Sequence, residues 1–153
     1  MIRDMVRLSL WGVQSKKKEI VRELFALGVL HLDQDKKERR FTFADMSRLS
    51  CRCANYFKAL GIEAGDRVML CLKRHYQFWP ILLGLNRIGA IAVPATNLLM
   101  EKDFDYCFSQ AEISAIICTA DGETLMEAER AGKKYPQLKL KLAVESRGGS
   151  INN

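Results

Sequence analysis

The sequence predicts an α/β fold built on a mostly parallel, doubly wound sheet. Short apolar segments alternate along the chain with longer segments in which apolar residues recur at spacings of three and four. Glycine, proline and helix-capping residues separate these segments. Strands and helices that alternate in this way are typical of a parallel sheet with helices on both of its faces.

The chain is expected to open with a compact βαβ unit. Residues 5–11 alternate between apolar and polar side chains, as a half-buried strand does. The apolar residues within 20–25 form one stripe on a helix that ends at Gly28. A second short strand is expected at residues 29–32, which completes the unit.

A charged connector at residues 33–40 marks the expected boundary between two parts of the chain. It follows the last apolar residue of the opening unit and precedes a helix-start pattern. We therefore expect a βαβ leader over residues 1–35 and a second domain, which holds a partial parallel sheet, over residues 36–153.

The second domain is expected to begin with a capped helix. Thr42 and Asp45 fit the pattern in which a Ser or Thr hydroxyl binds a free amide of the first turn, and Gly61 supplies the C-cap. The elements expected after it are a strand at 68–72, a helix at 75–89, a strand at 90–93, a helix at 101–111, a strand at 115–118, a helix capped by Asp121 that runs to about residue 134, and a strand at 138–144.

Charge and hydropathy argue against nucleic-acid and membrane partners. The net charge is +6, but the basic runs at 16–18 and 36–40 lie at a helix start and in a loop, where we expect solvated surfaces. The apolar run 78–100 contains Arg87 and Pro94. A charged residue near the middle of a membrane span costs about 2.5–3.5 kcal/mol, so we expect a buried helix and a buried strand there, with no membrane insertion.

The cysteines and histidines do not predict a metal site. The chain has five cysteines, none in a Cys-x-x-Cys pair, and only two histidines, so no zinc site of recognised spacing can form. An odd number of cysteines, several within apolar elements, is typical of free thiols in a reducing compartment. We expect a cytoplasmic protein.

Candidate ligand contacts follow from the expected sheet, because open parallel sheets bind ligands beyond the carboxyl ends of their strands. Three segments lie there, namely 73–75, 95–97 and 119–121. None of them is a glycine-rich phosphate loop, and no Ser-His-Asp or Cys-His set has a recognisable context. His75 is expected to be a surface histidine, and no catalytic residue is predicted.

Residues 38–153 resemble the N-terminal part of the AMP-forming acyl-CoA synthetases. The resemblance rests on ERRFTFADMSRLSCRCANYFKALGIEAGDRVML, YQFWPILLGLNRIGAIAVPATNLLMEKDFDY, AEISAIICTAD and GGSIN. The second stretch is closer to the branch that acts on short and medium-chain acids. The resemblance implies a reaction that uses ATP, magnesium and CoA, and it makes Thr96 and Asn97 candidate cofactor contacts, with a structural loop role as the alternative.

The family's catalytic motifs have no counterpart in the sequence. Its phosphate loop ending in lysine, its aromatic-Gly-x-Thr-Glu motif, its ribose-binding aspartate and its C-terminal catalytic lysine are all missing. We therefore expect a truncated segment that is inactive alone and binds no cofactor by itself. A truncated sheet leaves an unpaired edge, so self-association through that edge is expected.

Residues 1–32 resemble instead the N-terminus of the V-type ATPase subunit I, a stator subunit. The sequence that carries this resemblance is MIRDMVRLSLWGVQSKKKEIVRELFALGVLHL. The two resemblances meet at residues 33–37, as a natural or artificial gene fusion would produce. The alternative function is therefore a non-enzymatic interaction module whose leader contacts ATPase stator partners. A free-standing nucleotide binder is disfavoured by the missing phosphate loop.

Overall fold

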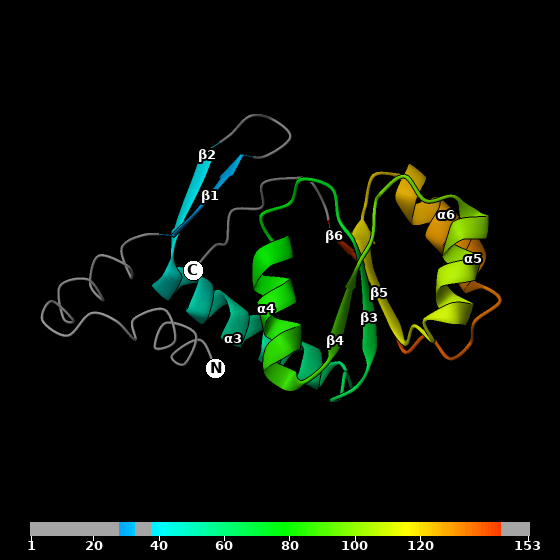
Figure 1. Ribbon diagram of the computed structural model, residues 1–153, viewed down its shortest axis with the longest axis horizontal. Helices are drawn as coiled ribbons and strands as arrows, with labels where there is room; N and C mark the ends of the chain where they lie inside the picture. Colours follow the sequence, from blue (N-terminus) through cyan, green and yellow to red (C-terminus); the bar gives the residue numbers. More distant parts are fainter. Residues whose placement is uncertain (1–27, 33–37, 145–153) are drawn as a thin grey trace, which may run out of the picture.

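The computed structural model describes residues 28–32 and 38–144. Its main body is a four-stranded sheet in the order β4-β3-β5-β6, and every neighbouring pair of strands is parallel. Figure 1 shows the sheet nearly edge-on, between two layers of helices. The strands are β3 (Arg67–Cys71), β4 (Ile91–Pro94), β5 (Ala115–Thr119) and β6 (Leu140–Val144). The predicted mostly parallel sheet is confirmed.

Two helices cover each face of the sheet, so the predicted doubly wound arrangement is also confirmed (Figure 1). Helices α3 (Phe43–Ala59) and α4 (Phe78–Ile88) pack on one face. Helices α5 (Glu101–Gln110) and α6 (Glu123–Gly132) pack on the other. The order of elements along the chain is that of successive βαβ crossovers, which are typical of α/β folds.

The alternation of side chains along the central strands creates the two cores. Val68 and Leu70 of β3 face α3 and α4, whereas Met69 and Cys71 face α5 and α6. All five residues of β5 are buried. A strand that is buried on both faces is apolar at nearly every position, and this is why β3 and β5 could be recognised as short, nearly continuous apolar runs.

The predicted cap of helix α3 is confirmed. The backbone amide of Asp45 donates to the Thr42 hydroxyl oxygen over 3.1 Å, and the Thr42 amide donates to the Asp45 carboxylate over 3.0 Å. These reciprocal bonds form a capping box. Hydrogen bonds from the Thr42 hydroxyl and amide lower the pKa of Asp45.

Helices α3 and α4 approach each other closely because small residues lie between them. A Cβ atom placed on Gly84 would lie 2.7 Å from Cys53 Cβ and 3.2 Å from the Ser50 carbonyl oxygen. Arg87 Nε donates to Ser50 Oγ over 2.8 Å at the same crossing. Leu85 and Ile81 can therefore enter the core beneath α3.

A β-hairpin stands apart from the parallel sheet. Strand β1 (Gly28–Leu32) pairs antiparallel with β2 (Glu38–Thr42). Phe41 of β2 stacks on Tyr76 with ring centroids 5.3 Å apart. This contact holds the hairpin beside the loop between β3 and α4, at the end of the sheet where β3 terminates (Figure 1).

Several predicted bounds are corrected. Residues 38–40 were expected in a connector but belong to β2, because they pair with 30–32 of the expected strand. Helix α4 begins at Phe78 rather than at residue 75, and α6 ends at Gly132 rather than near residue 134. Asp121, expected to cap α6, does accept the backbone amide of Thr124 in its first turn.

The strand expected at 5–11 and the helix expected to end at Gly28 lie outside the described residues. The βαβ leader over 1–35 and the domain boundary after it therefore stay predictions. Within residues 28–32 and 38–144, no helix is both long enough and apolar enough to cross a bilayer.

Candidate functional site

The crevice between β3 and β5 is the candidate functional site of this sheet. From β3 the chain crosses to β4 on one side, whereas β5 and β6 lie on the other side. The strand order therefore reverses between β3 and β5, and open α/β sheets bind ligands outside the carboxyl ends of the strands at such a point. Two of the three segments predicted at the carboxyl edge, 73–75 and 119–121, follow these two strands.

An ion pair joins the two strands across the crevice. Lys73 Nζ lies 2.5 Å from Asp121 Oδ2, and both side chains are largely shielded from solvent. The Lys73 amide donates to the hydroxyl oxygen of Thr119, a fully buried residue, over 2.9 Å. The structure thus brings together three residues that the sequence placed at this edge without predicting their contacts.

Asp121 also fixes the start of α6. Its carboxylate accepts the Thr124 amide over 2.8 Å and the Thr124 hydroxyl over 3.0 Å. Burial would raise the pKa of Asp121, but the hydrogen bonds from Lys73 and Thr124 outweigh burial and lower that pKa. The hydrogen bond to Asp121 is also the main reason that the pKa of Lys73 is raised.

The loop after β4 reaches the same crevice through its backbone. The Cys71 thiol donates to the Thr96 carbonyl oxygen over 2.9 Å, and the Thr124 hydroxyl oxygen, whose proton goes to Asp121, lies 3.4 Å from the Asn97 carbonyl oxygen. These contacts position Thr96 and Asn97, the candidate cofactor contacts, at the edge of the site. Their role toward a cofactor stays a prediction.

The site contains no activated nucleophile among the described residues. Burial raises the pKa of Cys71 to about 12 and that of Cys118 to about 11, so both thiols stay protonated at neutral pH. His75 was expected at the surface, but it is buried, since the chain turns inward between β3 and α4. No group of three or more His, Cys, Asp or Glu residues within 28–32 and 38–144 is arranged to hold a metal ion.

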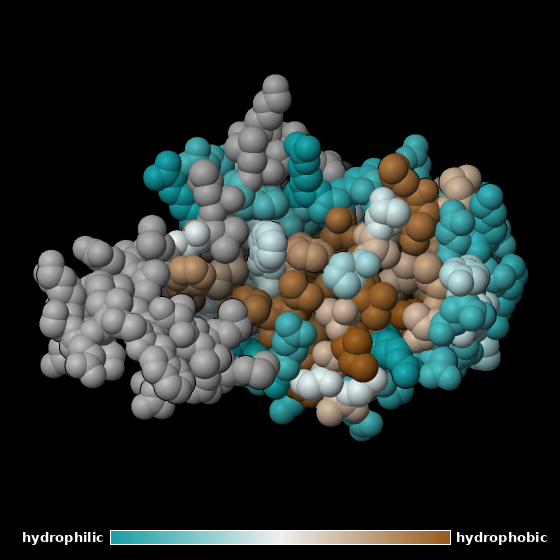
Figure 2. Space-filling view, in the orientation of Figure 1, coloured by the Kyte–Doolittle hydropathy of each residue, from teal (hydrophilic) through white to brown (hydrophobic). Residues whose placement is uncertain are grey.

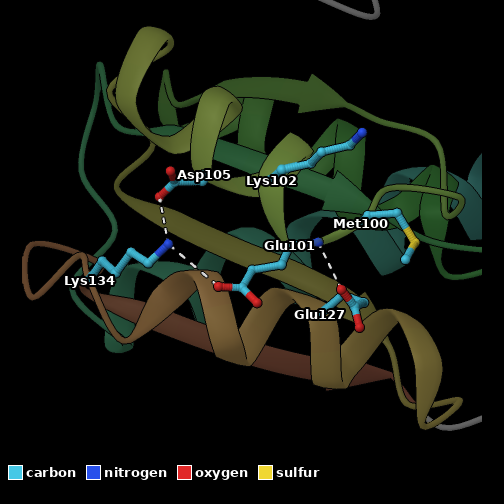
Figure 3. A pocket seen from close by; sticks show the side chains of 6 residues that line it. All are labelled: Met100, Glu101, Lys102, Asp105, Glu127 and Lys134. Carbon is cyan, nitrogen blue, oxygen red and sulfur yellow. Dashed lines mark hydrogen bonds and ion pairs between the residues drawn. The ribbon is translucent and has the colours of Figure 1, made fainter.

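A separate surface depression of about 440 Å³ lies between α5 and α6 (Figure 3). It is lined by Met100, Glu101, Lys102, Asp105, Glu127 and Lys134. Lys134 Nζ lies 3.4 Å from the Glu101 carboxylate and 3.7 Å from that of Asp105.

The carboxylates of this depression are already engaged by the protein itself. Glu127 accepts the Glu101 amide over 2.8 Å and also binds Arg130. The Asp105 carboxylate accepts the Tyr135 hydroxyl over 2.9 Å. The depression was not predicted, because its residues come from two helices that only the fold brings together. Its chemistry is that of paired surface charges.

Comparisons with known proteins agree with this fold. The family model described as AMP-binding enzyme matches residues 17–151. This match includes residues 17–32, for which a V-type ATPase resemblance was expected, so that resemblance stays a prediction without support.

Curated relatives resemble the chain over most of its length. It is 34% identical over 108 residues to the mitochondrial acyl-coenzyme A synthetase ACSM1 of Mus musculus, which covers 70% of this chain and 18% of the relative. It is 34% identical over 97 residues to the long-chain-fatty-acid–CoA ligase FadD13 of Mycobacterium tuberculosis, covering 63% and 19%. The chain thus spans about a fifth of the length of these relatives.

Solved structures show the same arrangement of strands and helices. An acyl-CoA synthetase from Brucella canis superposes with a TM-score of 0.67 at 21% identity, over 82% of this chain and 22% of that one. The inhibitor-bound N-terminal domain of FACL13 from Mycobacterium tuberculosis gives a TM-score of 0.66 at 25% identity, over 82% and 32%. Because the family model matches most of the sequence and the parallel sheet is shared, the chain belongs to the AMP-binding enzyme family.

Proposed function

We propose that these residues form the sheet-bearing N-terminal part of an acyl-CoA synthetase. The reaction is that of the family: a carboxylate attacks the α-phosphate of ATP and releases pyrophosphate, and the thiol of CoA then displaces AMP from the acyl group. ATP, magnesium and CoA are the expected cofactors of the complete reaction. The stretch from Trp79 to Thr96 favours a short or medium-chain acid.

The observation that carries this proposal is the ordered match of the parallel sheet to acyl-CoA synthetases. The chain is 34% identical over 108 residues to a curated acyl-coenzyme A synthetase, and its fold superposes on solved synthetases over 82% of its length. A reducing, cytoplasmic environment is part of the proposal. It is supported by free thiols at all five cysteines, each of which lies in the described part of the chain.

We further propose that these 153 residues do not form an acyl-adenylate by themselves. The groups at the carboxyl edge support this, since Lys73 and Asp121 bind each other and the nearby thiols stay protonated. None of these side chains supplies the positive charge that stabilises a pentavalent phosphate. The family's phosphate loop and catalytic lysine are also missing from the sequence.

Exchange of radiolabelled pyrophosphate into ATP tests whether these residues form an acyl-adenylate by themselves. The purified chain is assayed with acids from acetate to octanoate, with FadD13 as the positive control and a reaction without acid as the blank. We expect no exchange above the blank from a chain whose circular dichroism shows it to be folded. Acid-dependent exchange would overturn this proposal and require a catalytic set within these residues.

A chimera tests whether this segment can serve as the N-terminal part of an acyl-CoA synthetase. Residues 38–144 replace the matching segment of FadD13, and a second chimera carries Asp121→Ala in the same segment. If the segment is a working part of a synthetase, the first chimera retains exchange activity and the second loses part of it. A folded but inactive first chimera would contradict the proposal.

A further inference from the structure

The loop after β4 crosses the end of β3 and reaches the start of α6. Figure 2 shows apolar side chains gathered over α4 and β4 and mostly polar ones over α5 and α6, and this loop leads from the first surface to the second. The Ala95 amide donates to the Leu70 carbonyl oxygen over 2.9 Å, and the Asn97 carbonyl oxygen lies 3.4 Å from the Thr124 hydroxyl oxygen. Residues 95–98, which we call the crossing segment, therefore run over the carboxyl end of β3 toward the crevice between β3 and β5.

One buried thiol binds the backbone of the crossing segment. Cys71 is the last residue of β3 and is fully buried, and its thiol donates to the Thr96 carbonyl oxygen over 2.9 Å. Burial raises the pKa of this thiol to about 12, which keeps it protonated and able to donate. The Thr124 hydroxyl gives its proton to Asp121 and not to Asn97. Among the described residues, Cys71 is thus the side chain that holds the backbone of the segment by donating a hydrogen bond.

A second buried thiol provides an internal comparison. Cys118 of β5 lies directly opposite Cys71 in the parallel pairing, and both belong to the core beneath α5 and α6. The Cys118 sulfur lies 3.7 Å from the Leu142 carbonyl oxygen, so its contact is with β6 and not with the crossing segment. The two cysteines are equally buried and differ in what their thiols bind.

The crossing segment carries two polar side chains beside the crevice. Thr96 is exposed, and its hydroxyl oxygen accepts the Leu98 amide over 3.3 Å, which leaves the hydroxyl proton available to a ligand. The Asn97 carboxamide is half-buried and makes no hydrogen bond with another residue in the described part of the chain. Both groups can donate without carrying a charge. An oxygen atom of a carboxylate or a phosphate is the acceptor that such donors fit at the carboxyl edge of a parallel sheet.

We propose that Cys71 is a positioning residue of the candidate site. Its thiol holds the crossing segment over the end of β3, so that the Thr96 hydroxyl and the Asn97 carboxamide donate to a carboxylate or phosphate oxygen of the substrate. The role in substrate binding rests on the proposed function, whereas the hold on the segment does not depend on it. Loss of the thiol lets both donors move without removing them, so it should weaken substrate binding and leave the chemical step unchanged.

Nuclear magnetic relaxation of the whole chain tests the hold on the segment. The backbone order parameters of residues 96–98 should lie near about 0.85 in the wild type and below about 0.6 in Cys71→Ala. Cys71→Val, which lacks a donor but fills the core, should have the same effect. Cys71→Ser keeps a donor at this position and should retain the wild-type values.

The matched control is Cys118→Ala, which removes the same sulfur from the same core. It should leave the order parameters of residues 96–98 unchanged. A segment that is already mobile in the wild type would overturn the proposal. Equal loosening of the segment by Cys71→Ala and Cys118→Ala would overturn it as well, because the effect would then come from core packing.

Kinetics of the FadD13 chimera test the role in substrate binding. Cys71→Ala should raise the KM for ATP or for the acid at least about fivefold and keep kcat within about twofold, and Cys71→Ser should restore the KM. A rise confined to ATP identifies a phosphate oxygen, and one confined to the acid identifies a carboxylate oxygen. An active chimera in which neither KM moves would overturn the role in binding. An inactive parent chimera would contradict the proposed function itself, and the order parameters then decide the role of Cys71.

Discussion

At the scale of single residues, Asp121 has two structural roles. It pairs with Lys73 across the crevice, and it accepts two hydrogen bonds from Thr124 at the start of α6. The same carboxylate therefore holds the loop after β3 to the loop after β5. Since the backbone of Asn97 also meets Thr124, three loops at the carboxyl edge depend on this one side chain.

We expect Asp121→Ala to lower the free energy of unfolding by about 1–3 kcal/mol at pH 7, because a helix cap and charged hydrogen bonds are lost. The folded-state pKa of Asp121 lies below its ordinary value of 3.8. Its contribution is therefore present above that value and is lost as the pH falls through the lower folded-state pKa. Urea unfolding should show a smaller difference between wild type and variant near pH 3.

The control for this experiment is Glu129→Ala, which removes the same charge from an exposed position on α6. It should change the free energy of unfolding by no more than about 0.5 kcal/mol. An equal loss in both variants would show that net charge, and not the crevice network, accounts for the effect.

At the scale of secondary-structure elements, the crossing of α3 and α4 depends on residues without large side chains. Gly84 faces Cys53, Ala54 and Ser50, and any Cβ at this position is closer to Cys53 Cβ than real side chains come. The closest atoms belong to the β-carbon and backbone of another helix, which cannot rotate away. The interhelical distance is therefore set by glycine.

We expect Gly84→Ala to destabilise the chain by about 1–3 kcal/mol, since the helices must move apart and disturb the core beneath them. Helix propensity alone predicts the opposite sign, because alanine is favoured over glycine by about 1 kcal/mol within a helix. Urea unfolding measures the outcome. Asn86→Ala, an exposed position on α4, serves as the control, and stabilisation by Gly84→Ala would contradict the close crossing.

At the scale of the whole molecule, stability should differ between the sheet and the hairpin. β5 lies between β3 and β6 and is buried throughout, whereas the hairpin has two strands and lies away from the sheet. A two-stranded hairpin is marginally stable unless it packs on other elements. The contacts of Phe41 and Arg39 with Tyr76 supply part of that packing.

Hydrogen–deuterium exchange should therefore protect the amides of β3 and β5 most strongly, with opening free energies near the global value. The amides of the hairpin should exchange earlier. Tyr76→Ala should accelerate exchange in β2 and leave β5 unchanged, since the Tyr76 ring stacks on Phe41 and lies under the Arg39 guanidinium, both of β2. Equal protection of hairpin and sheet would show that the two unfold together.

Much of the fold could be predicted from the sequence, because it depends on local patterns. The apolar run at 68–72 and the capping pattern at Thr42 and Asp45 each report on neighbouring residues, and the structure has a strand and a capped helix there. The parallel sheet follows from the alternation of such elements. The positions of Lys73 and Asp121 at its carboxyl edge follow from the same alternation.

The sequence by itself thus determined the type and order of the strands and helices between residues 42 and 144, and the family to which the chain is similar. Only the tertiary structure decided that β1 pairs with β2 and that Lys73 binds Asp121. It also decided that His75, expected at the surface, is buried. The physical reason is that strand pairing, ion pairs and the burial of a loop residue depend on residues far apart in the chain. Hydrophobic periodicity and helix caps depend instead on residues within one turn or one strand.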